Sequence, residues 1–252
     1  MTGYGPLARW YDSLTEDVDY GDLYAYLMAL LEKNGLSMPE SVLDMACGTG
    51  SLACIFARAG IPEVYGMDLS EEMLTMAADK AAAMEKPPLF LHGDMSDFSL
   101  PEPVDLLTCM LDSFNYLTDP TDGERAIRCF ADAVRPGGML IFDIRPPRQL
   151  REFDGQIFMD ENDDVVCIWR TEFDEEELLC YYGMDLFIRQ GELWERRQEE
   201  HIEYAYEPED IKAMLLAAGF TDVCLYGDRS MLPPSVDEER IFITAKRGNN
   251  HV

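Results

Sequence analysis

The stretch VLDMACGTGSLA, residues 42–53, decides the fold. Its apolar start, Val42–Met45, is typical of a buried strand, Ala46–Gly50 is typical of a turn, and helix-like spacing begins at Ser51. Glycine permits positive φ and lets a ligand approach without a Cβ in the way. A helix that begins here offers free N–H groups and a partial positive charge. The stretch therefore predicts a strand, a turn and a helix suited to a nucleotide-like or carboxylate-bearing ligand.

The glycine turn by itself leaves two interpretations open. Residues Gly48–Ala53 fit the G-x-G-x-x-G/A fingerprint of dinucleotide-binding proteins. Glycine turns between a strand and a helix also occur in α/β proteins that bind nothing there. The segments that follow in the chain therefore decide whether this turn binds a ligand, and which one.

The next strand ends in an acidic residue. Pro62–Met67 is apolar and β-prone, and Asp68 follows it about twenty residues after the glycines, where a carboxylate accepts hydrogen bonds from both ribose hydroxyls. Ser70 predicts a helix N-cap, and Met73 lies on the buried stripe of that helix. Asp68 could instead be a solvated turn residue, but its place after this loop favours ribose binding.

A third strand carries a second acidic residue. Leu89–Leu91 predicts a short strand, and His92-Gly93-Asp94-Met95 ends it. An aspartate at this place can accept a hydrogen bond from an adenine amino group, and a methionine can cover the face of the ring. Asp94 and Met95 are therefore candidates for an adenine pocket.

Strands and helices continue to alternate. Val104–Met110 predicts a fourth strand and Thr121–Val134 a helix. Arg135–Gly138, with the sequence R-P-G-G, predicts a turn before a fifth strand at Met139–Ile144. This alternation favours an α/β fold with a mainly parallel sheet.

Together these segments resemble a known family. The set D-x-A-C-G-T-G, M-D-L-S, G-D-M and R-P-G-G, in this order, is similar to the class I S-adenosylmethionine-dependent methyltransferases over Ser41–Ile144. Pro208–Ala245 also fits, as a helix, a turn and two strands. In layout the chain most resembles small-molecule enzymes, the glycine and sugar-amine N-methyltransferases. The resemblance implies a Rossmann-like seven-stranded sheet with a C-terminal antiparallel hairpin.

The resemblance also implies cofactor contacts, position by position. Ala46, Gly48 and Gly50 would pass close to the methionine part of S-adenosylmethionine, and Asp44 would support its ammonium group. Asp68 would hold the ribose diol. Ala46 stands where the family often has its first glycine, and Asp68 where it often has Glu. The other expected contacts are Tyr11, Leu69, Met73, Asp94, Met95, Met110 and Leu111.

Two segments lie outside the common core. Residues 1–145 and 207–252 predict that core with N-terminal cap helices, among them an amphipathic helix at Tyr20–Lys33. Residues 146–206 predict an inserted antiparallel sheet, because polarity alternates with period two from Val165 to Phe173 and Gln190-Gly191 suits a hairpin turn. This sheet would cover the active site or form a homodimer contact. Its arginines either bind a substrate carboxylate or pair with neighbouring glutamates: Arg145, Arg170, Arg196 and Arg197.

Composition narrows the class of protein. The 252 residues carry 49 acidic and 20 basic side chains, a net charge of −29, which argues against nucleic-acid substrates because phosphate binding needs a basic surface. No run is long enough to span a membrane, and the N-terminus does not resemble a secretory signal. The seven cysteines are scattered without a C-x-x-C pair, as in the reducing cytoplasm, and we expect no metal site.

Methyl transfer from a sulfonium requires few catalytic groups from the protein. It is an in-line displacement, so most of the rate can come from holding the acceptor near the methyl group. Candidates for positioning or proton removal are Tyr11, Tyr116 and His201, although Tyr11 could simply be a packed aromatic and His201 a structural histidine. Asp112 and Asp143 both end strands, but they lack the paired ligands of metal-dependent O-methyltransferases.

The sequence thus predicts a cytoplasmic enzyme that transfers a methyl group from S-adenosylmethionine to a small molecule. One alternative is a nicotinamide-dependent oxidoreductase, which is disfavoured because no Tyr-x-x-x-Lys pair is present. The other is a protein that binds S-adenosylmethionine without catalysis.

Overall fold

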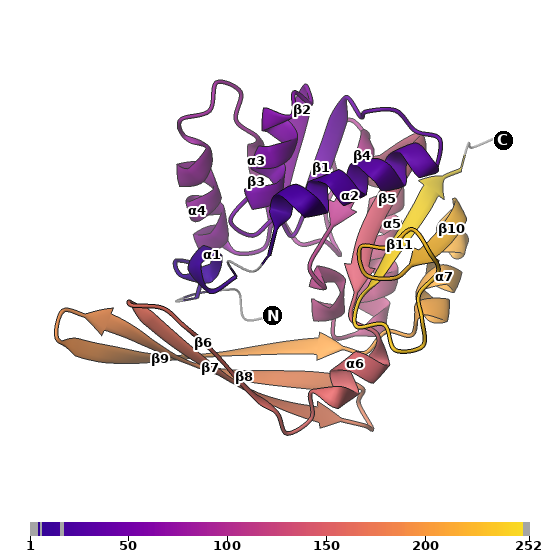
Figure 1. Cartoon of the computed structure of the whole chain (residues 1–252). Coiled ribbons are helices and arrows are strands. Elements are labelled where there is room, and N and C mark those ends of the chain that lie inside the picture. Colours follow the sequence, from indigo (N-terminus) through magenta and orange to yellow (C-terminus); the bar gives the residue numbers. More distant parts are fainter. Residues whose placement is uncertain (1–4, 6, 16–17, 249–252) are drawn as a thin grey trace.

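The computed structural model describes residues 5, 7–15 and 18–248, and these form two sheets joined by helices. The sequence also predicts a short aromatic segment at Tyr4–Leu14, and of this stretch Tyr4 and Pro6 lie outside the described residues. A seven-stranded sheet forms the core, and a separate four-stranded sheet lies below it in Figure 1. The chain is therefore an α/β protein with an inserted antiparallel sheet, as the sequence predicts.

The core sheet has the strand order β10-β11-β5-β4-β1-β2-β3. Strands β1 to β5 run parallel, whereas β11 is antiparallel to both β5 and β10. The chain reverses the order of the strands at β1 and β4, and ligands bind beyond the carboxyl ends of strands at such a switch point. The bounds are β1 Ser41–Met45, β2 Glu63–Asp68, β3 Leu89–His92, β4 Val104–Cys109, β5 Val134–Ile144, β10 Phe220–Tyr226 and β11 Ile241–Arg247.

Helices connect these strands, and side-chain caps fix where several of them begin. Ser70 caps α4 by accepting from the amide of Met73, as predicted, and Asp119 caps α5 just before Pro120. In Figure 1, α2 crosses in front of the sheet and lies next to α3. The bounds are α1 Tyr11–Leu14, α2 Tyr20–Lys33, α3 Ser51–Arg58, α4 Glu71–Ala81, η1 (a 3₁₀ helix) Ser113–Tyr116, α5 Pro120–Ala133, α6 Pro147–Glu152 and α7 Pro208–Ala217.

The inserted sheet consists of four antiparallel strands in sequence order: β6 Ile157–Glu161, β7 Val165–Asp174, β8 Leu179–Gln190 and β9 Leu193–Tyr204. The hairpin at Gln190-Gly191 forms as predicted, and Gly191 has the positive φ of 67° that this turn requires. The short helix α6, which precedes the sheet, was not predicted. Leu7, Trp10 and Leu14 of the N-terminal segment pack on the sheet, so α1 lies between the sheet and the core (Figure 1).

The R-P-G-G segment is the main local difference from the sequence prediction. Residues 135–138 do not form a turn ahead of the fifth strand, because β5 already begins at Val134 and includes them. Val104 pairs with Val134 and Leu106 pairs with Met139, so the extra residues form a bulge. A Cβ on Gly138 would lie 2.7 Å from the carbonyl oxygen of Asp105, which explains the glycine in the bulge.

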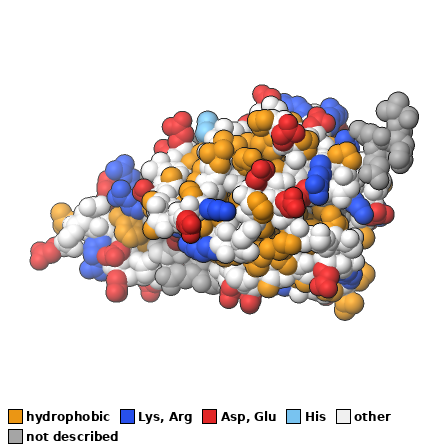
Figure 2. All heavy atoms as spheres, turned by 90° about the horizontal axis from the view of Figure 1, so that it is seen from above, with side chains coloured by type: hydrophobic (Ala, Val, Ile, Leu, Met, Phe, Trp, Pro, Cys, Tyr) orange, Lys and Arg blue, Asp and Glu red, His pale blue; other side chains and the backbone are white. Residues whose placement is uncertain are grey.

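Charged side chains of both signs are interspersed on the face seen from above in Figure 2, and the hairpin end of the inserted sheet projects beyond the core. Among the described residues, no helix combines the length and the apolar character that a membrane crossing requires.

Replacing Gly123 with alanine tests the packing where the chain returns from the inserted sheet. A Cβ on Gly123 would lie 2.5 Å from the hydroxyl oxygen of Tyr206, which donates a hydrogen bond to Leu117 and is buried. We expect Gly123→Ala to lower the free energy of unfolding by about 1–3 kcal/mol in urea titrations, although alanine favours helices.

The same substitution in a Tyr206→Phe background provides the control. Without the hydroxyl the new methyl group meets less resistance, so the penalty of Gly123→Ala should be smaller there. An equal penalty in both backgrounds would contradict this packing argument.

Candidate cofactor site and its surroundings

The turn after β1 has a left-handed backbone at alternate positions. Ala46, Gly48 and Gly50 have φ values of 53°, 54° and 72°. A Cβ on Gly50 would lie within 3 Å of Phe90 and Ala77, so this glycine is needed for packing beneath the turn. A Cβ on Gly48 would enter open space, and its backbone is accessible to a ligand. Ala46 adopts, with a side chain, a conformation that glycine adopts more easily.

Asp68 ties this turn to the next one. One carboxylate oxygen accepts a hydrogen bond from the backbone N–H of Gly48 at 2.8 Å, and the other accepts from Ser70, also at 2.8 Å. Asp68 is buried, and burial raises its pKa despite these bonds. The carboxylate therefore holds the β1–α3 and β2–α4 turns at a fixed separation.

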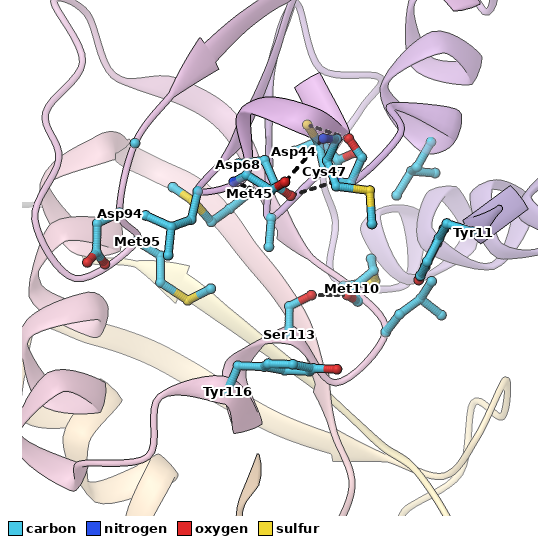
Figure 3. Close-up of a pocket in the computed structure, with 18 of the residues that line it drawn as sticks. Tyr11, Asp44, Met45, Cys47, Asp68, Asp94, Met95, Met110, Ser113 and Tyr116 are labelled. Atoms are coloured by element: carbon cyan, nitrogen blue, oxygen red, sulfur yellow. Dashed lines mark hydrogen bonds between the residues drawn. The ribbon is translucent and has the colours of Figure 1, made fainter. Parts of the chain in front are cut away.

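A cavity lies where these turns meet, beyond the carboxyl ends of β1, β2 and β4. In Figure 3, Asp94 and Met95 lie at one end of the cavity and Tyr11 at the other, with Asp44 and Asp68 between them. The structure brings together twelve of the residues singled out in the sequence: Tyr11, Asp44, Ala46, Gly48, Asp68, Leu69, Met73, Asp94, Met95, Met110, Leu111 and Tyr116. Gly50 and His201 are outside the described residues that line the cavity.

Several lining residues were not predicted from the sequence to line a binding site. Most are chain neighbours of predicted ones, so widening each motif by one or two positions would have found them: Met45, Cys47, Leu52, Ser70, Gly93 and Ser113. Tyr20, at the start of α2, has no such local signal. Only the packing of α2 brings it to the cavity.

Asp44 is a buried carboxyl group in the wall of the cavity. It accepts a hydrogen bond from the hydroxyl of Thr108 at 2.8 Å. Burial raises its pKa from 3.8 to about 7, against the effect of that hydrogen bond. A cation in the cavity would favour the charged form of Asp44, so this residue suits the ammonium end of a ligand.

The loop after β4 is held by a buried ionic network. Leu111 and Asp112 both have positive φ, 60° and 53°, and Asp143 accepts hydrogen bonds from both of their backbone N–H groups. Arg240 pairs with Asp143 and, at 2.7 Å, with Asp112. These interactions stabilise an unfavourable backbone conformation that places Leu111 against the cavity. Asp112 and Asp143, which were considered as metal ligands from the sequence, are thus paired with Arg240.

The inserted sheet joins this network through Glu203 on β9. Glu203 is buried, and burial together with the charge of Asp112 raises its pKa to about 8. Tyr182 on β8 donates a hydrogen bond to it at 3.2 Å. Arg145 lies 3.1 Å from Asp112 and also faces Glu203. The inserted sheet is thereby connected to the loop that borders the cavity.

The two tyrosines of the N-terminal region are neutral phenols. Burial, followed by the charge of Asp112, raises the pKa of Tyr11 above its usual range. Burial also raises the pKa of Tyr20, whose side chain is hydrogen-bonded to Tyr11. Because both groups keep their protons at neutral pH, Tyr11 is suited to positioning and not to proton removal.

His201 lies one ring away from the cavity. Its ring meets the ring of Tyr116 edge-on, with centroids 5.8 Å apart, and Tyr116 lines the cavity. Nε2 of His201 lies 3.3 Å from a carboxylate oxygen of Glu199, whose other oxygen accepts from the backbone N–H of Leu7 at 2.6 Å. This histidine is therefore oriented by a buried carboxylate behind Tyr116.

The other arginines of the inserted sheet pair with acidic neighbours. Arg170 and Arg196 both contact Asp185, and Arg197 contacts Glu195 at 2.5 Å. The arginine side chains are about half exposed, as expected for a solvated strand face.

The cavity fits S-adenosylmethionine by the chemistry of its walls. Open space beside Gly48 leaves room for a ligand against the backbone, and the carboxyl groups of Asp44 and Asp68 suit an ammonium group and a ribose diol. Apolar side chains suit the adenine ring and the sulfonium: Leu69, Met73, Met95, Met110 and Leu111.

Comparison with known proteins agrees with this geometry. Residues 42–138 match the family model described as "Methyltransferase domain". A putative methyltransferase of Bacillus subtilis (strain 168), YqeM, is 31% identical over 99% of both chains. The crystal structure of an S-adenosylmethionine-dependent methyltransferase from Clostridium acetobutylicum ATCC 824 has a TM-score of 0.86 and 30% identity, covering 96% of this chain and 98% of that one.

A third relative is named for its acceptor. The dTDP-4-amino-2,3,4,6-tetradeoxy-D-glucose N,N-dimethyltransferase of Saccharopolyspora spinosa is 34% identical over 45% of this chain and 43% of its own length. The fold and the site define a Rossmann-like enzyme that binds S-adenosylmethionine. The chain belongs to the S-adenosylmethionine-dependent methyltransferases. Nothing in these findings favours the nicotinamide-dependent alternative or a protein without catalysis.

The raised pKa of Asp44 predicts a pH dependence of cofactor binding. If Asp44 supports the ammonium group, binding requires its carboxylate form, so affinity rises with pH up to about 7 and then levels off. Below that pKa the affinity for S-adenosylhomocysteine should change by up to about tenfold per pH unit, measured by calorimetry.

Asp44→Asn is the matched control, because it keeps the shape and removes the titrating group. Its binding should be weaker at neutral pH and nearly independent of pH over the same range. A variant that keeps the pH profile of the wild type would exclude Asp44 as the titrating group.

Proposed function

We propose that the enzyme methylates an amine on a small polar molecule, which binds in the cavity beside Tyr116. The single observation that carries this proposal is that His201, which contacts the ring of Tyr116, pairs with Glu199, whose side chain is only 8% exposed. An amine that arrives protonated must lose a proton before it attacks, and an oriented histidine is suited to accept it.

The charges near the cavity support an amine over an anionic acceptor. Arg145 and Arg240, the cations beside the loop after β4, are engaged by Asp112 and Asp143. The net charge of −29 also favours the approach of cationic molecules over phosphorylated ones.

The names of relatives support nitrogen as the methylated atom, but the first of them names an acceptor that carries a nucleotide diphosphate, unlike the cationic amine proposed here. The Saccharopolyspora spinosa relative is named as an N,N-dimethyltransferase of an amino sugar, and its similarity covers about half of this chain. A solved sugar N-methyltransferase from Streptoalloteichus sp. ATCC 53650, KedS8, shares the fold with a TM-score of 0.80 at 23% identity. We propose a small amine, with amino sugars as the first compounds to test.

The chain's own residues then have separate tasks. Bound S-adenosylmethionine supplies an electrophilic methyl group on its sulfonium. Tyr116 would orient the acceptor nitrogen toward that methyl group. His201, held by Glu199, is outside the described residues that line the cavity, so it would take up the proton through a water or the Tyr116 side chain that lies between them. Tyr11 would cover the methionine end of the cofactor as a neutral phenol.

We further propose a cytoplasmic location and an enzyme with neither nucleic-acid nor membrane partners. The acidic charge and the absence, among the described residues, of a helix suited to cross a membrane support this. A homodimer through the inserted sheet remains part of the proposal, because apolar side chains on its first strand are exposed, among them Ile157 at 67% and Met159 at 58%.

Isotope transfer tests the class of acceptor. The protein is incubated with methyl-deuterated S-adenosylmethionine and matched sets of amines, amino sugars, phenols and carboxylic acids, and products are identified by mass spectrometry. We expect labelled N-methyl products. Transfer only to oxygen or carbon would refute the proposal. The control is Asp68→Ala, which should bind the cofactor weakly, so any label that still appears with this variant is transferred without the cofactor site.

The same assay separates a proton acceptor from a structural histidine. His201→Asn should lower kcat by about 10²–10⁴-fold, with the loss partly reversed at higher pH, where more acceptor arrives unprotonated. Affinity for S-adenosylhomocysteine should be unchanged, because His201 does not line the described cavity. An unchanged kcat would exclude proton transfer by His201.

A further inference from the structure

A polar cluster ties α1 to the two helices next to the glycine turn. The hydroxyl of Thr49 donates to one carboxylate oxygen of Asp12 at 2.5 Å, and the ammonium of Lys80 lies 2.7 Å from the other. Lys80 also donates to the hydroxyls of Thr49 at 2.8 Å and Ser51 at 2.6 Å. We refer to Asp12, Thr49, Ser51 and Lys80 as the Asp12–Lys80 cluster.

Helix α1 depends on contacts with other parts of the protein. It has only four residues, too few to be stable alone, and none of its side chains is fully buried. Trp10 and Leu14 pack against the inserted sheet, while Asp12 is held by the core. Figure 1 shows α1 between the end of α4 and the inserted sheet.

The cluster is next to the cavity without being part of it. Tyr11, the neighbour of Asp12, lines the cavity, and so does Gly48, the neighbour of Thr49. Asp12, Thr49 and Lys80 lie outside the described residues that line it. Anchoring Asp12 therefore fixes Tyr11 over the cavity from outside the cavity wall.

The exposure of the cluster suits a contact that opens and closes. The side chains of Asp12 and Lys80 are 45% and 25% exposed. An ion pair in contact with water contributes little to stability and weakens as salt rises. Such a contact can hold a short helix in place and still release it in each catalytic cycle.

We propose that Asp12 and Lys80 are positioning residues that hold Tyr11 across the cofactor cavity and so set how long the cofactor and its product stay bound. The proposal concerns cofactor exchange and does not depend on which acceptor is methylated. Substituting Asp12 or Lys80 should change the dissociation rate of S-adenosylhomocysteine and the KM for S-adenosylmethionine. The rate of methyl transfer itself should not change, because neither residue lies at the reacting atoms.

The test measures the dissociation rate of S-adenosylhomocysteine by stopped-flow competition. Lys80→Met and Asp12→Asn should each accelerate dissociation about three- to tenfold and raise the KM for S-adenosylmethionine by a similar factor. The single-turnover rate with saturating cofactor should stay near that of the wild type. Lys86→Met is the matched control, because Lys86 is an exposed lysine just beyond α4.

The double variant distinguishes an ion pair from two unrelated effects. If the two residues act as one contact, Asp12→Asn/Lys80→Met dissociates no faster than the faster single variant. If the accelerations of the two single variants multiply in the double variant, the two residues do not act as one contact. If the single variants dissociate no faster than Lys86→Met, the proposal is wrong.

Salt provides a readout on the unmodified enzyme, in case a variant folds poorly. Dissociation from the wild type should accelerate as ionic strength rises, because salt screens the exposed pair. A wild-type rate that does not respond to salt would count against the ion pair.

Discussion

The cofactor cavity depends above all on the carboxylate of Asp68. Its two oxygens accept the backbone N–H groups of Gly48 and Ser70, and these belong to the turns that follow two adjacent parallel strands. Parallel strands leave such turns side by side but do not fix their separation. A buried carboxylate between them sets that distance, and an acidic oxygen at the bottom of the cavity is the consequence.

A second carboxylate plays the matching role on the other side of the switch point. Asp143 at the end of β5 binds the backbone of Leu111 and Asp112, where both residues have left-handed φ values. Arg240, just before β11, neutralises this pair of aspartates. The wall of the cavity at Met110 and Leu111 is thus held by a residue of β5 and by one that precedes β11, far along the chain.

The local sequence predicts the part of the cavity that is built from strand ends, and little of the surroundings contributed by α2 and the inserted sheet. The glycine turn, Asp68 and Asp94 each lie at or just after the end of a strand, so a local pattern is enough to place them. The contacts of Tyr20, Glu199 and Glu203 are tertiary. They exist because α2 and the inserted sheet pack against the core, and no spacing in the sequence encodes that packing. The bulge at Gly138 was missed for a related reason, since the steric limit comes from the carbonyl of Asp105 on the neighbouring strand.

The position of β11 has a consequence for how the chain folds. β5 ends at Ile144, and its outer edge pairs with β11, which begins at Ile241, roughly a hundred residues later in the chain. Because the two strands are so far apart in sequence, their pairing forms late and costs much chain entropy. During synthesis on the ribosome, the half-built core therefore has an open hydrophobic edge while the inserted hairpins emerge. Those hairpins pair only with their neighbours in sequence, so they can fold first. The insertion is then a folded unit already in place when the last strand closes the sheet.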